Sequence, residues 1–369
     1  MPATLVITDR TTSFLAKYIG NFARELAELG SQLYTIAPAP YTGLHQDQII
    51  QQLSTVPASG AEVERYMEAF AYARSQGITH LHIPFLNDAE TLLKALSSST
   101  NEFQITCSIF GLAAYLQKPF LYEQLIHHPV VRKVLIHSNA PEITRRTAHY
   151  FQILNASNVT YMHDPIYDEP GMYQAEQEVA RRWLNLPLDL PIILYFGTYF
   201  HKKGADLLLD SLAEFSDRQD VCFVLAGSTA TAPAGFDKAK YQQPNVIFDD
   251  RYIDEITAGQ YFRAADLIVQ PYRRLYEHDT SGVLVQSSLA QRPVLIPDIS
   301  PFCETVQRFH LGLTFRCEDR HDLAHQIAHF LTHPMLPSDL GCREHLQYIE
   351  SWAKITYYLL DLEEKELAV

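Results

Sequence analysis

Several familiar catalytic signatures are missing from this 369-residue sequence. It contains no G-x-S-x-G nucleophile elbow, no G-x-x-x-x-G-K-[ST] phosphate loop and no H-E-x-x-H zinc motif. No G-x-G-x-x-G follows the first predicted strand, where a dinucleotide-binding domain would carry that motif. The 16 histidines do not fall into a metal-ligand spacing. We therefore predict no bound metal and no cofactor.

The sequence also lacks paired cysteines, long apolar runs and a basic N-terminus. No apolar run reaches the roughly 20 residues that a membrane-spanning helix needs. Residues 1–9 carry no basic region of the kind that begins a signal peptide. The five cysteines lie far apart and form no C-x-x-C pair, which favours reduced thiols in a cytoplasmic protein; they are Cys107, Cys222, Cys303, Cys317 and Cys342.

Positive charge is scarce. The net charge is -14, from 29 Lys and Arg against 43 Asp and Glu. This balance argues against nucleic-acid binding, because phosphate backbones are held by clustered Lys and Arg. A small local basic pocket for one or two phosphates stays compatible with it. Hydrophobic residues make up 47% and charged residues 20%, as in ordinary folded proteins, and the length favours two domains.

Short runs rich in Val and Ile alternate with longer segments of helical period, which predicts parallel strands joined by crossover helices. A Pro-containing charged stretch at 168–190 separates two such sets and predicts an inter-domain connection. Leu346, Ile349, Trp352, Ile355, Leu359 and Leu362 share one face, which predicts a single terminal helix over 346–362. The predicted strands are 4–8, 33–37, 80–83, 104–109, 133–137, 159–162, 192–196, 222–226, 246–248, 267–270, 294–296 and 312–315.

A lysine–glycine pair at the start of a predicted helix gives the strongest local signal. The strand 192–196 ends at Gly197, and a short loop then leads to Lys203 and Gly204. A lysine at this point can reach a phosphate, with help from free N–H groups at the positive end of the helix. The alternative is a solvated strand–helix loop, where lysine is common.

Two further loops follow predicted strands, at the edge where open α/β sheets bind ligands. After strand 267–270, Thr280 or Ser281 can cap the next helix, and Gly282 allows a ligand to approach the backbone closely. Strand 222–226 ends at Gly227, where a flat ligand could lie against the chain. A well-capped helix and an ordinary strand end are the alternatives.

Taken in order, these segments resemble the retaining GT-B glycosyltransferases of family 4. The second half carries counterparts of the family's G-x5-K-G loop, strand ending in Ala-Gly, Y-R-x-A-D segment, Ser-Gly loop and P-E-x-V turn. The corresponding residues are 197–204, 221–227, 261–266, 281–298 and 301–306, and Ser351 and Trp352 resemble the S-W start of the family's terminal helix. The first half resembles the family only in outline.

The resemblance implies two Rossmann-like doubly wound parallel-sheet domains facing across a cleft. They would comprise an acceptor-side domain at 1–170, a donor domain at 171–345, and a terminal helix at 346–369 that crosses back to the first domain. It implies a nucleotide-diphosphate sugar as donor, a carbohydrate or lipid-linked acceptor, and sugar transfer with retention and without a metal. It implies weak peripheral membrane contact as an option, and it leaves the oligomeric state open.

Carried over to this sequence, the resemblance implies that Lys203 neutralises the donor diphosphate. Backbone N–H groups would hold the phosphate oxygens, and strand ends would border the nucleoside. The implied donor-binding set is Gly197, Thr198, Lys203, Gly227, Ser228, Tyr252, Thr280, Ser281, Gly282, Val283 and Gln286.

The sequence departs from the family at several of these positions. The family's pair of glutamates, eight positions apart, is replaced by His278 and Gln286, with Glu277 one place from the first. Lys203, Glu277 and His278 are therefore the candidate catalytic residues. Thr198 stands where the family often has arginine, which leaves Arg273 or Arg274 as substitutes. On the acceptor side, Thr11, Thr12 and Ser13 replace a Gly-Gly pair, and Phe110 replaces a histidine.

These departures keep three hypotheses open. The first is an active glycosyltransferase, for which Lys203 and the Ser281–Gly282 loop are the evidence. The second is a catalytically degenerate GT-B protein that acts as a partner subunit or nucleotide-sugar sensor. The third is a nucleotide-sugar epimerase on the same fold, which no sequence feature favours.

Overall fold

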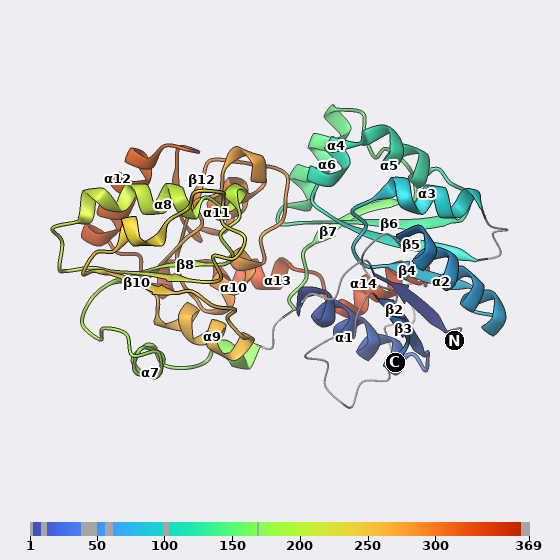
Figure 1. Ribbon diagram of the computed structural model, residues 1–369, viewed down its shortest axis with the longest axis horizontal. Coiled ribbons are helices and arrows are strands. Elements are labelled where there is room, and N and C mark those ends of the chain that lie inside the picture. Colours follow the sequence, from blue (N-terminus) through green and yellow to red (C-terminus); the bar gives the residue numbers. More distant parts are fainter. Residues whose placement is uncertain are drawn as a thin grey trace. The chain divides into compact units, whose positions relative to one another are not determined.

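The computed structural model of the chain describes residues 3–8, 13–37, 50–55, 62–98, 103–167 and 170–362. The chain divides into two compact units. Unit 1 comprises Met1–Tyr167 and Ile349–Val369, and unit 2 comprises Asp168–Tyr348. Each unit is built around one parallel sheet with helices on both faces (Figure 1).

The described part of unit 1 forms a parallel sheet of seven strands in the order β3-β2-β1-β4-β5-β6-β7. The sequence order reverses between β1 and β4, which are paired with each other. The strands are β1 (Thr4–Ile7), β2 (Leu33–Ala37), β3 (Ile50–Thr55), β4 (His80–Ile83), β5 (Gln104–Phe110), β6 (Val131–Ser138) and β7 (Val159–His163).

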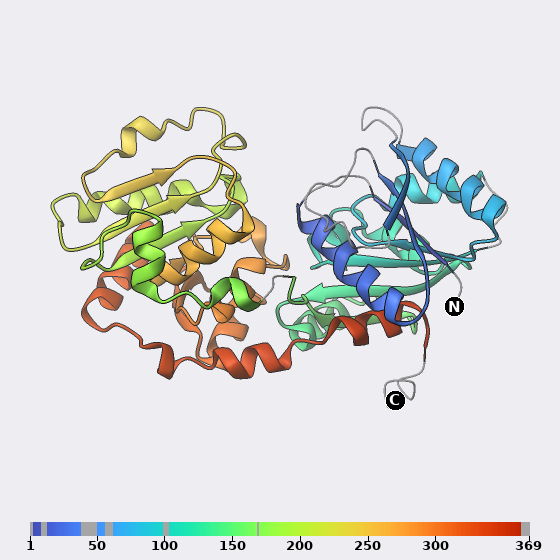
Figure 2. The same cartoon turned by 90° about the horizontal axis from the view of Figure 1, so that it is seen from below.

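Two buried apolar clusters place the helices of unit 1 on the two faces of its sheet. Helices α1 (Ser13–Glu28) and α14 (Trp352–Leu359) share one cluster with side chains of β1 and β6, and they lie side by side in Figure 2. The other cluster contains side chains from α2 (Glu62–Gln76), α3 (Ala89–Ser97), α4 (Ala113–Gln117), α5 (Pro119–Ile126) and α6 (Pro141–Tyr150).

Unit 2 has the same kind of sheet, with six parallel strands among the described residues in the order β10-β9-β8-β11-β12-β13. Here the order reverses between β8 and β11. The strands are β8 (Ile192–Phe196), β9 (Cys222–Ala226), β10 (Val246–Asp249), β11 (Leu267–Val269), β12 (Val294–Pro297) and β13 (Gly312–Phe315).

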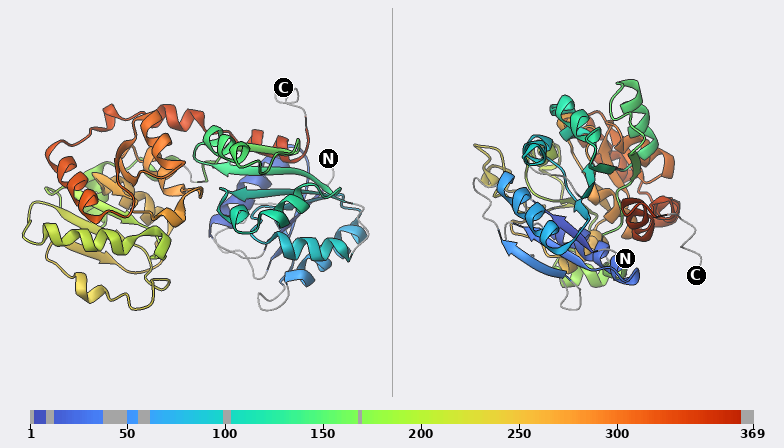
Figure 3. Two further views of the ribbon diagram at one scale, coloured as in Figure 1. Left: turned by 90° about the horizontal axis from the view of Figure 1, so that it is seen from above. Right: turned by 90° about the vertical axis from the view of Figure 1, so that its right-hand side faces the viewer.

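The helices of unit 2 also divide between two clusters. Helices α8 (Ala205–Ser211) and α12 (Arg320–Thr332) pack together over one face, and Figure 3 shows them next to each other. The other cluster contains side chains from α7 (Gln177–Trp183), α9 (Glu255–Ala264), α10 (Gly282–Leu289), α11 (Phe302–Phe309) and α13 (Cys342–Tyr348).

All twelve predicted strands are present, with ends that differ by at most two residues. Strand β3 was not predicted. Its sequence IQQLST is largely polar, as an edge strand can be, because only one of its sides pairs with a neighbour.

The prediction of a single helix over 346–362 is wrong. Helix α13 ends at Tyr348, and α14 begins at Trp352 after a break. The Ser351 hydroxyl accepts a hydrogen bond from the Lys354 N–H and caps α14. Among the described residues, no helix is long and apolar enough to cross a membrane.

Candidate functional site

The candidate site of unit 2 lies where the strand order reverses. Ligands of open α/β sheets bind at the carboxyl ends of the strands beside such a point. In unit 2 this edge carries the loops that follow β8, β9, β10 and β11. The predicted donor-side residues from Gly197 to Ser281 lie on these loops, and Gly282, Val283 and Gln286 follow in the first two turns of α10.

Two glycines bring the first two of these loops into backbone contact. Gly227 has a φ of +145°, and a Cβ atom at this position would lie 2.1 Å from the carbonyl oxygen of Gly197. Gly197 itself has a φ of +135°. A larger residue at either position would therefore be strained. The glycines let the ends of β8 and β9 approach each other and leave a surface of bare backbone.

Lys203 lies against this glycine surface. A Cβ atom on Gly197 would lie 3.2 Å from the Lys203 Nζ. The side chain is half-buried. Burial, followed by the charge of neighbouring Lys202, lowers the pKa of Lys203 from 10.5 to about 8. A bound anion would stabilise the charged form of Lys203, because its negative charge offsets the solvation that burial removes.

The other cations at this edge are paired with carboxylates. Their ion pairs are Lys202 with Asp279 at 2.5 Å, Arg251 with Asp249 at 2.8 Å, Arg273 with Asp206 at 2.6 Å, and Arg274 with Glu277 at 3.5 Å. Within the described parts of the chain, Lys203 has no such partner. The structure thus distinguishes Lys203, the lysine predicted to bind phosphate, from neighbouring Lys202, which is paired with Asp279.

Ser281 caps helix α10, which settles the choice between Thr280 and Ser281. Its hydroxyl accepts from the Leu284 N–H at 3.4 Å, donates to the Gln270 Oε1 at 2.8 Å, and lies 2.9 Å from the Tyr272 hydroxyl. The side chain is 1% exposed, so it holds the loop rather than a ligand. The N–H groups of Gly282 and Val283 lie in the first turn, where a helix offers them no acceptor.

The loop before α10 carries the two remaining candidate catalytic residues. Glu277 is half-buried and pairs with Arg274. His278 has a φ of +66°, a conformation that costs a non-glycine residue roughly 1–3 kcal/mol. The His278 N–H donates to the Ser300 carbonyl at 2.9 Å, which anchors the loop to the segment that follows β12. Gln286 follows, half-buried, in the second turn of α10.

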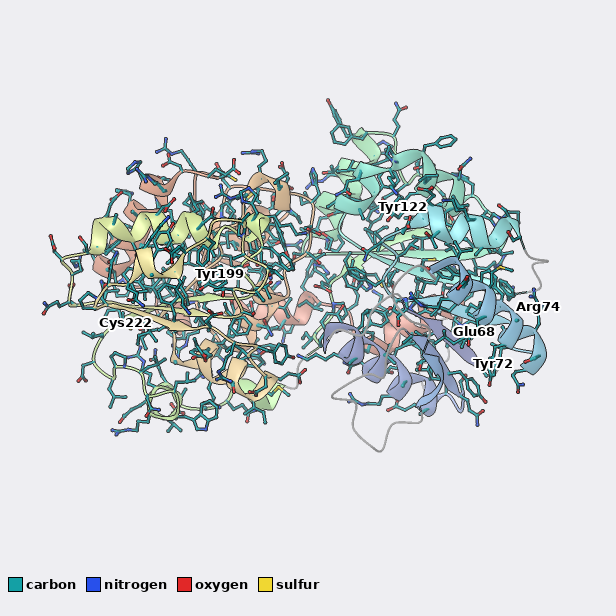
Figure 4. The ribbon with its side chains drawn as sticks, viewed as in Figure 1. Glu68, Tyr72, Arg74, Tyr122, Tyr199 and Cys222 are labelled. Atoms are coloured by element: carbon teal, nitrogen blue, oxygen red, sulfur yellow. The ribbon has the colours of Figure 1, made fainter. Side chains whose placement is uncertain are left out.

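The ends of β9 and β10 form another border of the site. The Tyr199 N–H donates to the Ser228 carbonyl at 3.3 Å, which joins the loop after β8 to the loop after β9. Tyr199 is labelled in Figure 4. Tyr252 follows β10 and is 67% exposed, so its ring is available for stacking with a flat ligand. Thr198 is half-buried, and its carbonyl accepts from the Tyr195 hydroxyl.

The predicted acceptor-side residues belong to unit 1. Thr11 and Thr12 lie outside the described residues, and Ser13 begins α1 with a side chain that is likewise not described. Phe110 ends β5 and is 8% exposed. Its ring stacks on His137 and on Phe85, with centroid distances of 4.5 and 5.1 Å. Phe110 therefore packs in an aromatic layer at the carboxyl end of the sheet.

The sequence analysis did not predict the contacts that hold two of the site loops together. The Lys202 Nζ reaches Asp279 and lies 4.7 Å from the centre of the Tyr276 ring. The Arg273 N–H also donates to the Lys202 carbonyl. These contacts hold the Lys203 loop beside the start of α10. Both guanidinium groups pair with carboxylates, although the Arg273 Nε has no hydrogen-bond partner among the described residues. The suggestion that Arg273 or Arg274 serves as a phosphate ligand therefore stays a prediction.

Comparisons with known proteins concern the family and the fold of the chain. Residues 190–333 match the family model of the glycosyl transferases group 1. A search of the curated proteins finds no match for the sequence.

Solved structures resemble both units of the chain. Sucrose-phosphate synthase from Thermosynechococcus elongatus aligns with a TM-score of 0.77 at 18% identity, over 100% of both chains. Anabaena HepE in complex with UDP-glucose aligns with a TM-score of 0.73 at 13% identity, over 98% of this chain and 99% of that one. A glycosyltransferase from Rickettsia africae aligns with a TM-score of 0.70 at 12% identity, over 98% of this chain and 99% of that one. The predicted fold class, two Rossmann-like GT-B domains, is confirmed.

Proposed function

We propose that this protein is a glycosyltransferase that moves a sugar from a nucleotide-diphosphate sugar to a carbohydrate or lipid-linked acceptor. The observation that carries the proposal is Lys203, an unpaired, half-buried cation against bare glycine backbone. It lies within the segment 190–333 that matches the glycosyl transferases group 1. Because Anabaena HepE was solved with UDP and with UDP-glucose, UDP-sugars are the first donors to test.

In the proposed reaction, an acceptor hydroxyl oxygen forms a bond to the anomeric carbon. The bond between that carbon and the diphosphate oxygen breaks, and the diphosphate leaves with the electron pair. The hydroxyl proton passes to the departing diphosphate. Lys203 and the N–H groups at the start of α10 stabilise the growing negative charge of the leaving group. We further propose retention at the anomeric carbon, no metal requirement, and contacts from Glu277 and His278 to the sugar.

The cysteines support a reducing, cytoplasmic location as part of the proposal. All five are unpaired, which is typical of proteins in compartments that keep thiols reduced.

Calorimetric titration of UDP, GDP and ADP into the wild type and Lys203→Ala tests the donor site. We expect one nucleoside diphosphate to bind and the variant to lose roughly 10- to 150-fold in affinity, as for a lost hydrogen bond to a charged group. Absence of binding to all three would refute the donor site. Donor binding without transfer to any of a panel of acceptors would instead favour the sensor, the second hypothesis of the sequence.

A further inference from the structure

Unit 1 contains a buried arginine that forms no ion pair. Arg65 lies in the first turn of α2 and is 3% exposed. Its Nε and Nη2 atoms have no hydrogen-bond partner. Among the described residues, no carboxylate forms an ion pair with it. No other described residue has two orphaned side-chain atoms of this kind.

Arg65 lies on the side of α2 that faces the sheet. Arg65, Ala69 and Ala73 are spaced four residues apart and are all buried, and the two alanines pack in the cluster that contains side chains of β1 and β2. The side chains of Glu64 and Glu68 on the same helix are exposed. Figure 4 labels Glu68 and Arg74 on this helix. Glu68 is one turn further along α2, close enough in spacing to pair with Arg65, but it forms no ion pair with Arg65.

The direction of α2 places Arg65 at the ligand-binding edge of unit 1. Helix α2 follows β3 and precedes β4, and both strands belong to the same parallel sheet. A crossover helix of this kind begins at the carboxyl ends of the strands and runs back to their amino ends. The first turn of α2, with Arg65, therefore lies at the carboxyl edge, where open α/β sheets bind ligands.

A buried guanidinium group without a counter-charge is strongly unfavourable, because arginine keeps its charge in proteins. Its five N–H donors form a planar fork that matches the oxygens of a phosphate or a carboxylate. A ligand that supplies such an oxyanion would satisfy both the charge and the two orphaned nitrogens.

We propose that Arg65 binds a phosphate or carboxylate group carried by the acceptor, so that the protein glycosylates an anionic acceptor. The inference rests on the proposed transferase function, with unit 1 as its acceptor side. Arg65 recognises the acceptor away from the reacting hydroxyl, and it contributes to acceptor binding and not to the chemistry at the anomeric carbon.

The test titrates glucose 6-phosphate, glucuronate, glucose and inorganic phosphate into protein saturated with UDP. It compares the wild type with Arg65→Met, which keeps the length and apolar stem of the side chain. The matched control is Arg74→Met, because Arg74 is an exposed arginine at the other end of α2. Affinity for UDP and the Tm are measured for each protein.

We expect at least one anionic sugar to bind tenfold or more tightly than glucose. Arg65→Met should lose this preference while UDP affinity is unchanged and Tm is equal or higher, because an unpaired buried charge is removed. Arg74→Met should behave as the wild type.

Three results would overturn the inference. One is a wild type that binds UDP but prefers no anionic sugar. Another is inorganic phosphate that binds as tightly as the sugar phosphate, which would indicate a free-anion site. The third is a Tm several degrees lower in Arg65→Met with unchanged ligand binding, which would indicate a structural role for Arg65. If the wild type does not bind UDP at all, the proposed donor site is refuted instead.

Discussion

Donor binding should make the protein take up a proton at alkaline pH, because of Lys203. In the free protein the pKa of Lys203 is lowered to about 8. At pH 9 only about one-tenth of the molecules then carry the charged lysine. A bound diphosphate favours the charged form and should return the pKa towards 10.5, the value of an ordinary lysine. About 0.9 proton should therefore be taken up at pH 9, and only about 0.1 at pH 7.

The same values give the free energy involved. A pKa lowered from 10.5 to about 8 corresponds to roughly 3.4 kcal/mol, less what solvent screening removes from a half-buried group. Below pH 8 the folded protein bears this cost, because it must hold the charged lysine against the glycine backbone. Above pH 8 the cost disappears as the proton leaves, and unfolding becomes harder until about pH 10.5. A bound diphosphate recovers much of the same free energy.

Calorimetry of UDP binding in two buffers of different ionisation enthalpy measures this uptake directly. The phosphate contributes little at pH 9, because its own pKa lies near 6. Lys203→Ala should abolish the uptake. Lys202→Ala should keep it, because Lys202 is exposed and paired with Asp279. If the wild type takes up no proton at pH 9 although UDP binds, Lys203 does not contact the diphosphate and the reasoning fails.

Three further predictions concern stability, each measured by urea denaturation. Gly227→Ala should cost roughly 2–4 kcal/mol, because the new Cβ would clash with the Gly197 carbonyl; Gly282→Ala, where a Cβ meets nothing within 4 Å, is the control, and equal losses would contradict the clash. Ser281→Ala should cost roughly 1–3 kcal/mol, because it removes the helix cap and buried hydrogen bonds. A loss below about 0.5 kcal/mol, which is typical of an ordinary surface site, would contradict that role. Burial raises the pKa of Asp164 from 3.8 to about 7, so the folded state binds this proton more tightly and stability falls as pH rises from about 4 to about 7; Asp164→Asn should flatten this slope by at most roughly 4 kcal/mol, and an unchanged slope would contradict it.

The fold was largely predictable because both sheets are covered on both faces. Strands in such sheets are continuous apolar runs, and Ile192–Phe196 and Cys222–Ala226 are examples that any hydrophobicity pattern detects. Strand β3 lies at an edge and has a polar sequence, so it carries no such signal. The break between α13 and α14 was also missed, because the apolar stripe continues across it.

The candidate site was predictable only to the level of its loops. The sequence selects Lys203 through its Lys–Gly pair, but it does not show that neighbouring Lys202 is held in an ion pair. That ion pair depends on Asp279, which lies 77 positions from Lys202. The same holds for Arg273, whose partner Asp206 is 67 positions away. Arg65 did leave a signal, since an arginine interrupts the apolar stripe that continues through Ala69 and Ala73.

Lys203 and Arg65 are both cations at the carboxyl edges of their sheets without an ion-pair partner among the described residues, but the two side chains differ in whether they can lose their charge. Lysine can give up its proton, so the cost of burying Lys203 is limited when no donor is bound. Such a group suits a ligand that arrives and departs in every cycle. Arginine keeps its charge, so the cost at Arg65 persists until an oxyanion neutralises it. Raising the pH to 9 should therefore weaken UDP binding at Lys203 and leave the anion preference at Arg65 unchanged. If UDP binding and the preference for anionic sugars both weaken at pH 9, the two ligands share one anion site.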